Sequence, residues 1–248
     1  MEAQHSVLTL EHYELKYVIS AEMSAAICEF LESHCCLDSY SQDNPNHYYP
    51  ISSLYLDNLE NESWLRSEVF NCHLRIRSYG TSPYYAEIKY KVKNFVKKRR
   101  APIYSENWAH IVRQGTSGHR MNAESLKNLE DFVFMIETYD AHPILLTQYQ
   151  RKAYESPGED GVRVTLDRNL CAQATDKWCL YPEEFSSAIE VDPQKIILEF
   201  KCKRNIPAWL INLVHEFQLV DYDISKFDTS LYYLKRNLTS VIANAIGN

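Results

Sequence analysis

The sequence predicts an α+β protein in which a closed antiparallel β-sheet forms a tunnel with a charged interior, with helices packed on the outside. Three observations support this fold class. Several segments alternate between charged and apolar residues, as strands with two different faces do. Other segments carry apolar residues at helical spacing and need a surface on which to bury them. With 248 residues, 45% of them hydrophobic, the chain can fold as a single domain over residues 1–248.

Two neighbouring segments form the centre of this prediction. Residues 71–79 and 84–92 both alternate, and the Gly-Thr-Ser-Pro stretch between them has turn composition, so they are predicted to pair as a hairpin. One side of this hairpin carries four cations and a single carboxylate, namely Arg75, Arg77, Lys89, Lys91 and Glu87. Like charges that face each other across a sheet are destabilising, so this side is expected to face water or an anion.

The remaining elements are predicted from the same patterns. Before the hairpin, we expect a strand over 12–19, a helix capped by Ser20, a loop over 38–50, a strand over 51–57 and a helix or turn over 58–66. After it, we expect an extended segment over 95–104, a loop with a helical turn over 105–122 and a helix around 126–136. Further strands are expected over 143–154, 162–167 and 195–203, and helices are expected to begin near Pro207 and Ser225. The run at 97–100 would by itself indicate a surface loop, but its place directly after a basic hairpin favours a third cationic strand.

Helices packed outside a closed sheet would cover the apolar faces of the strands, and the charged faces would then line a water-filled interior. The expected inward set is Glu14, Lys16, Arg75, Arg77, Glu87, Lys89, Lys91, Arg151, Arg163, Glu199 and Lys201. Burying so many cations without partners is costly, so the interior is expected to be wet and to bind a polyanion. The carboxylates in this set have two open explanations. They form internal salt bridges, or Glu199 and Glu14 hold Mg²⁺ or Mn²⁺ together with substrate phosphates.

Composition excludes several function classes. The net charge of −7 argues against general nucleic-acid binding, although residues 70–102 contain nine Lys or Arg and one acid. This contrast indicates a focused anion site in an acidic protein. The seven cysteines are odd in number and lack metal-type spacing, so they are expected to be reduced thiols of a cytoplasmic protein. No signal peptide and no apolar stretch long enough to span a membrane is expected in this chain.

Between about residues 12 and 236, the chain carries eight short motifs: 13–17, 53–57, 74–80, 87–89, 98–100, 162–167, 198–201 and 225–227. In this order they resemble the VTC domains, the polyphosphate polymerase domains named for the vacuolar transporter chaperone complex. These domains belong to the triphosphate tunnel metalloenzymes. The resemblance implies an antiparallel tunnel that binds ATP and inorganic polyphosphate with Mn²⁺ or Mg²⁺. It also implies transfer of the γ-phosphate of ATP to a growing polyphosphate chain.

The motifs also imply roles for individual residues. When the roles of the family's residues are assigned motif by motif, the resemblance implies that Glu199 holds the metal. It also implies that the catalytic phosphate contacts are Lys16, Arg75, Arg77, Lys89, Arg151, Arg163 and Lys226. The further substrate contacts that we expect are Lys91, Lys98, Arg100, Lys201 and Ser225, and Glu14 is the second expected metal ligand. Two rival functions stay open, namely a hydrolase of tripolyphosphate or nucleoside triphosphates, and a non-catalytic module that binds polyphosphate or inositol phosphates.

Overall fold

The computed structural model describes residues 13–58, 70–92, 95–115, 121–157, 161–181, 188–203, 205–222 and 224–246. Nearly all of the helix or turn expected over 58–66 lies outside these residues. The chain divides into two compact units, which are described separately. Unit 1 comprises Met1–Tyr48, Arg151–Asp167 and Gln194–Asp223, and unit 2 comprises Tyr49–Gln150, Arg168–Pro193 and Ile224–Asn248. The single domain expected over residues 1–248 stays a prediction.

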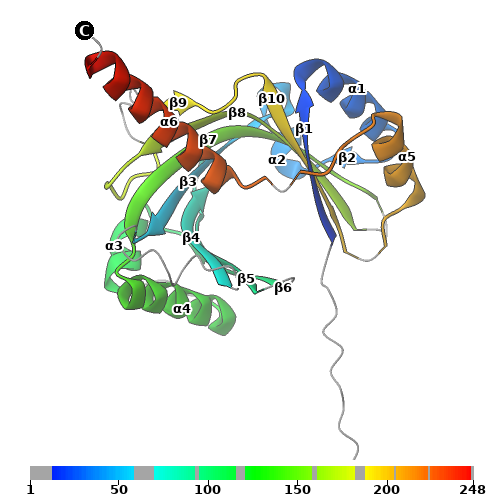
Figure 1. The fold of residues 1–248 in the computed structure, drawn as a ribbon. Coiled ribbons are helices and arrows are strands. Elements are labelled where there is room, and N and C mark those ends of the chain that lie inside the picture. The colour runs from blue at the N-terminus through cyan, green and yellow to red at the C-terminus, as the bar shows by residue number, and fades with distance from the viewer. Residues whose placement is uncertain are drawn as a thin grey trace, which may run out of the picture. The chain divides into compact units, whose positions relative to one another are not determined.

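The elements confirm the mixed α+β class (Figure 1). The strands are β1 (Tyr13–Ser20), β2 (Cys36–Leu37), β3 (Tyr49–Asp57), β4 (Phe70–Ser78), β5 (Tyr84–Val92), β6 (Phe95–Ile103), β7 (His142–Glu155), β8 (Val162–Ala174), β9 (Ile189–Glu190) and β10 (Lys195–Cys202). The helices are α1 (Ala21–Glu32), α2 (Ser39–Gln42), α3 (Trp108–Gln114), α4 (Ala123–Tyr139), α5 (Ala208–Glu216) and α6 (Lys226–Ile246), with a 3₁₀ turn η1 (Pro45–His47).

The strands form one large sheet in the order β1-β10-β8-β7-β3-β4-β5-β6, with β2 beside β7 and β9 beside β8. The predicted hairpin is confirmed, because β4 and β5 pair antiparallel, and β6 continues the sheet beside β5. In the part of the chain that the structure describes, β1 and β6 end the strand order and do not pair with each other. The sheet is therefore not closed, and the closed tunnel expected from the sequence is not confirmed.

Each unit has its own core on one face of its strands. In unit 1, the apolar sides of β1, β8 and β10 pack with α1 and α5 around residues such as Leu198 and Phe200. In unit 2, the apolar sides of β3 to β6 pack with α3 and α4 around residues such as Leu74 and Ile76. Because side chains alternate along a strand, the charged residues of these strands lie on the face opposite the helix-covered core.

Local sequence signals explain where several helices begin. Ser20 caps α1 as predicted, since its side chain accepts a hydrogen bond from the backbone of Met23 at 3.1 Å. Asp38 caps α2 in the same way through the backbone of Ser41 at 2.8 Å, so the loop expected over 38–50 contains a short helix.

Among the described residues, no helix combines the length and apolar character that crossing a membrane requires.

Candidate functional site

The strand registers of unit 2 place five of the predicted phosphate contacts on one face. Where β4 pairs with β5, Arg75 is directly opposite Glu87 and Arg77 is opposite Tyr85. Where β6 pairs with the other edge of β5, Arg100 is opposite Glu87 and Lys98 is opposite Lys89. Residues that face each other in this way point to the same side of a sheet. We call this set the cationic face of unit 2, and its members are Arg75, Arg77, Lys89, Lys98 and Arg100.

Glu87 is the centre of the cationic face. Its side chain is only 1% exposed, and its carboxylate lies 2.7 Å from Arg75 Nε, 2.7 Å from Lys98 Nζ and 3.1 Å from Arg100 Nε. Burial opposes ionisation of this carboxyl group, but the surrounding cations outweigh burial and hold the pKa of Glu87 well below its usual value. The face therefore contains its own counterion, which fixes three cations around one point.

Two groups on this face have pKa values displaced towards neutrality. Burial lowers the pKa of Lys98 to about 8, although the Glu87 carboxylate acts in the opposite direction. Burial would raise the pKa of the Tyr79 hydroxyl, but Arg77 and Arg100 lower it to about 8. Strongly displaced pKa values of this kind are common at functional sites, because several charges are held close together there.

The guanidinium groups are positioned by further contacts. Arg77 is buried and donates from Nε to Ser53 Oγ at 3.0 Å. Arg100 donates from Nη2 to the hydroxyl of Tyr79 at 2.8 Å, and its guanidinium carbon lies 3.5 Å from the ring centroid of Tyr85. These contacts restrict the side chains before any ligand arrives, which reduces the entropy that binding must offset.

Helix α6 brings two predicted contacts to unit 2. Ser225 lies at its start and accepts a hydrogen bond from the backbone of Asp228 at 3.4 Å. Lys226 Nζ lies 5.0 Å from the ring centroid of Tyr149. Phe227 fixes this end of the helix, because its ring contacts Tyr55 and also the ring of His73, which shares the face of Arg75. The predicted contact Lys91 is on β5, but its side chain lies outside the described residues.

Unit 1 carries a second charged face, on β1, β10 and β8. Glu14 is opposite Lys201 and Lys16 is opposite Glu199, so the four side chains share one side of the sheet. Within each strand, cation and carboxylate also pair, with 3.2 Å between Lys16 Nζ and Glu14 and 2.9 Å between Lys201 Nζ and Glu199. Of the two explanations left open by the sequence, internal salt bridges are present.

The same face offers donors that fit a hard divalent cation. Glu14 and Glu199 are diagonal neighbours, a relationship that separates residues by about 7–8 Å. Thr165 is opposite Glu199, and its buried hydroxyl has no hydrogen-bond partner in the described part of the chain. Magnesium sites in proteins often use one or two carboxylates completed by substrate phosphates, so this donor set fits. No cluster of three or more His, Cys, Asp or Glu side chains arranged for a metal is present among the described residues.

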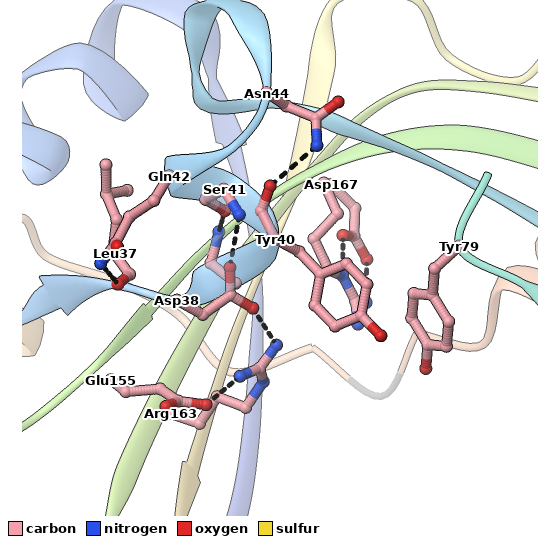
Figure 2. A network of polar contacts seen from close by, with 12 residues as sticks. Leu37, Asp38, Tyr40, Ser41, Gln42, Asn44, Tyr79, Glu155, Arg163 and Asp167 are labelled. Carbon is pink, nitrogen blue, oxygen red and sulfur yellow. Dashed lines mark hydrogen bonds and ion pairs between the residues drawn. The ribbon is translucent and has the colours of Figure 1, made fainter. Parts of the chain in front are cut away.

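Arg163, also on this side of unit 1, is held by two carboxylates that sequence reasoning missed (Figure 2). Its Nη2 lies 2.6 Å from Asp38 Oδ2, and its Nη1 pairs with Glu155. Asp38 is almost fully buried and also caps α2, while Ser41 of α2 accepts a hydrogen bond from the backbone of Ala153 at 2.9 Å. This network connects Arg163 to a helix cap and to strand β7.

The predicted phosphate contact Arg151 has a bidentate carboxylate partner. Its Nε and Nη2 lie 2.6 Å and 2.7 Å from the two carboxylate oxygens of Asp167, and both side chains are buried. The inward cations were expected to lack partners, and this expectation is wrong for Arg151 and Arg163. The alternating run at 162–167 puts Asp167 on the side of Arg163, and the sequence predicts that this strand pairs with the strand of Arg151. The structure confirms that β8 lies beside β7, which brings Asp167 to Arg151.

Comparisons with known proteins identify the family. The VTC domain family model matches residues 11–235. A comparison with curated proteins finds no match. Among solved structures, the chain is similar to the PH1819 protein from Pyrococcus horikoshii OT3, with 12% sequence identity, a TM-score of 0.48, and coverage of 92% of this chain and 99% of that chain. The family match covers most of the sequence, so the chain belongs to the VTC domain family, and this membership supports a polyphosphate-related function.

Proposed function

We propose that the chain is a polyphosphate polymerase that transfers the γ-phosphate of ATP to a growing inorganic polyphosphate chain, with Mn²⁺ or Mg²⁺ as cofactor. The observation that carries this proposal is the cationic face of unit 2, where five cations lie on adjoining strands around the buried carboxylate of Glu87. Such a face suits a substrate with many closely spaced negative charges, because charge-assisted hydrogen bonds to phosphate are strong. Membership of the VTC domain family supports the same substrate class.

The proposed transfer needs positioning and electrostatic stabilisation more than acid–base chemistry. A terminal oxygen of the acceptor chain attacks the γ-phosphorus, the bond from that phosphorus to the bridging oxygen breaks, and ADP leaves. The attacking oxygen is already ionised, so a strong general base is not required. Arg75 and Arg77 would stabilise the charge on the transferring phosphoryl group, and both guanidinium groups already have hydrogen-bonded partners that orient them.

The metal and the tunnel complete the proposal. Glu199 and Glu14 would hold the divalent cation, with the Thr165 hydroxyl close to Glu199. When bound, the metal would act as a Lewis acid on phosphate oxygens. The closed tunnel with a charged interior, expected from the sequence and from the resemblance, stays a hypothesis, because the described strands form an open sheet.

The test is incubation of the purified chain with ATP and Mn²⁺. We expect ADP and a long, acid-labile phosphate polymer in matching amounts, and loss of both in the Arg77→Ala variant. Arg99→Ala is the matched control, because Arg99 lies between two members of the cationic face but pairs with Asp131 on the opposite side of the strand. Its turnover should stay within about twofold of the original chain, since pairs at exposed sites contribute little.

Other products would point to the rival functions. Release of orthophosphate without polymer would show that the protein is a hydrolase of tripolyphosphate or nucleoside triphosphates and not a polymerase. Binding of polyphosphate with no turnover, unchanged by metal, would indicate a non-catalytic binding module. A melting curve of each variant separates loss of activity from loss of folding.

A further inference from the structure

A cluster of aromatic rings around one guanidinium group lies in unit 2 next to the turn of the β4–β5 hairpin. Arg100 stacks on the ring of Tyr85 at 3.5 Å and also donates a hydrogen bond to the hydroxyl of Tyr79 at 2.8 Å. The rings of Tyr79 and Tyr85 meet edge to face with centroids 5.6 Å apart. Tyr49, which is almost fully buried, packs against Tyr79 with centroids 6.2 Å apart.

This aromatic cluster continues the cationic face. Tyr85 is opposite Arg77 and precedes Glu87 by two residues on the same strand, so it points to the same side. The rings of Tyr79 and Tyr85 and the side chain of Arg100 are only half-buried. Along β5, Tyr85 and Lys89 are four residues apart, which is about 13–14 Å in a strand. An extended nucleoside triphosphate spans such a distance from its base to its terminal phosphate.

We infer that Tyr79, Tyr85 and Arg100 form a platform on which the base of a nucleoside triphosphate stacks, while its phosphates lie along the neighbouring cations. The inference rests on the proposed function, and it adds the orientation of the nucleotide. The base lies at the hairpin-turn end of β5, and the terminal phosphate lies towards Lys89. Arginine planes and tyrosine rings are the surfaces on which proteins commonly stack bases.

Stacking has a clear consequence for specificity. Every base has a π face, so a stacking platform tolerates different bases, unlike a site that reads hydrogen bonds on a base edge. The platform therefore predicts similar affinities for ATP and GTP. It also predicts that tripolyphosphate, which has the phosphates but no base, binds more weakly than ATP.

Calorimetric titration of the purified chain with ATP and, separately, with tripolyphosphate tests the inference. In Tyr85→Leu, which removes the ring but keeps an apolar side chain, we expect the affinity for ATP to fall by about tenfold or more. The affinity for tripolyphosphate should change by less than about twofold, because the phosphate contacts remain. Tyr79→Phe keeps the ring and should preserve the ratio of the two affinities. Tyr104→Leu is the matched control, since Tyr104 is an exposed tyrosine beyond the end of β6, and it should change neither affinity.

Each contrary result has a distinct meaning. If Tyr85→Leu lowers the affinity for ATP and the affinity for tripolyphosphate by the same factor, the platform is overturned, and Tyr85 only supports Arg100. Unchanged binding of both ligands in that variant places the base elsewhere and also overturns the platform. Equal binding of ATP and tripolyphosphate by the original chain overturns the platform but keeps the polyphosphate function. If the original chain binds neither ligand, the platform and the proposed function both fail.

Discussion

Lys98 Nζ lies 2.7 Å from Glu87 Oε1, and that carboxylate is almost completely buried. Arg75 and Arg100 reach the same carboxylate from the two flanking strands. A single acid therefore organises cations from β4 and β6, and its removal should affect both folding and anion binding.

Glu87→Gln should destabilise the chain by about 3–5 kcal/mol at neutral pH, because it leaves several cations around a buried neutral group. The pKa of Glu87 is lowered in the folded state, so its contribution is fully present above the usual carboxyl pKa of 4.5 and is lost as the pH falls below that value. Urea unfolding of both proteins at several pH values measures this. The difference in unfolding free energy should shrink below about pH 4.5. A difference that is constant down to pH 3 would contradict the role given to Glu87.

Anion binding should weaken as the pH rises through 8. Lys98 loses its positive charge and Tyr79 becomes negative near this pH, since both pKa values are about 8. Both changes make the cationic face less positive, so the affinity for tripolyphosphate should fall by roughly tenfold between pH 7 and pH 9. Calorimetric titration across this range provides the measurement.

The variant Lys98→Arg separates the contribution of Lys98. Arginine stays charged throughout this range, so the decline with pH should become shallower. Lys97→Arg is the control, because Lys97 lies on the other face of β6. If the affinity for tripolyphosphate changes with pH in the same way in the original chain and in Lys98→Arg, Lys98 does not control that affinity.

Glu199→Gln should weaken metal binding. Glu199 is 7% exposed and is the more buried of the two proposed ligands. We expect the Mn²⁺ concentration that half-saturates the protein to rise by at least about tenfold. Direct Mn²⁺ binding measured by electron paramagnetic resonance is the readout. Glu190→Gln, at an exposed carboxylate on β9, is the control, and equal Mn²⁺ affinity in both variants would exclude Glu199 as a ligand.

Asp38→Asn should cost about 1.5–3 kcal/mol of unfolding free energy. Asparagine can still cap α2, but it removes the charge that faces Arg163 at 2.6 Å. Glu155→Gln changes the exposed partner of the same arginine and should cost less than about 1 kcal/mol. Urea unfolding compares the two variants. A larger cost for Glu155→Gln would reverse the assignment of Asp38 as the main anchor of Arg163.

Alternation in the sequence was sufficient to predict the hairpin of β4 and β5 and the face on which Arg75, Arg77 and Lys89 lie. Period-two patterns carry this information because one-residue slips would expose the core. The pattern could not predict whether the outer strands pair, since each strand has the same two faces in an open or a closed sheet. The pattern therefore could not distinguish a closed tunnel from an open sheet.

The ion pairs were harder to predict. The contact of Arg163 with Asp38 joins residues 125 positions apart, and no local signal in the sequence relates them. Helix α2 was missed because its four residues are too few to show helical periodicity. None of the seven cysteines forms a disulfide in the structure, and their reduced state stays a prediction. The cytoplasmic location stays a prediction.

The buried carboxylate of Glu87 also bears on how a polymer would leave. Cations that already face an internal carboxylate attract phosphate less strongly than cations without a counterion. Each phosphate of a bound polyphosphate would therefore be held with moderate strength. A polymer that grows at one end has to advance past the same side chains after every addition. If the chain makes polyphosphate as proposed, the Glu87 carboxylate among these cations would ease that movement and would weaken the binding of any single phosphate.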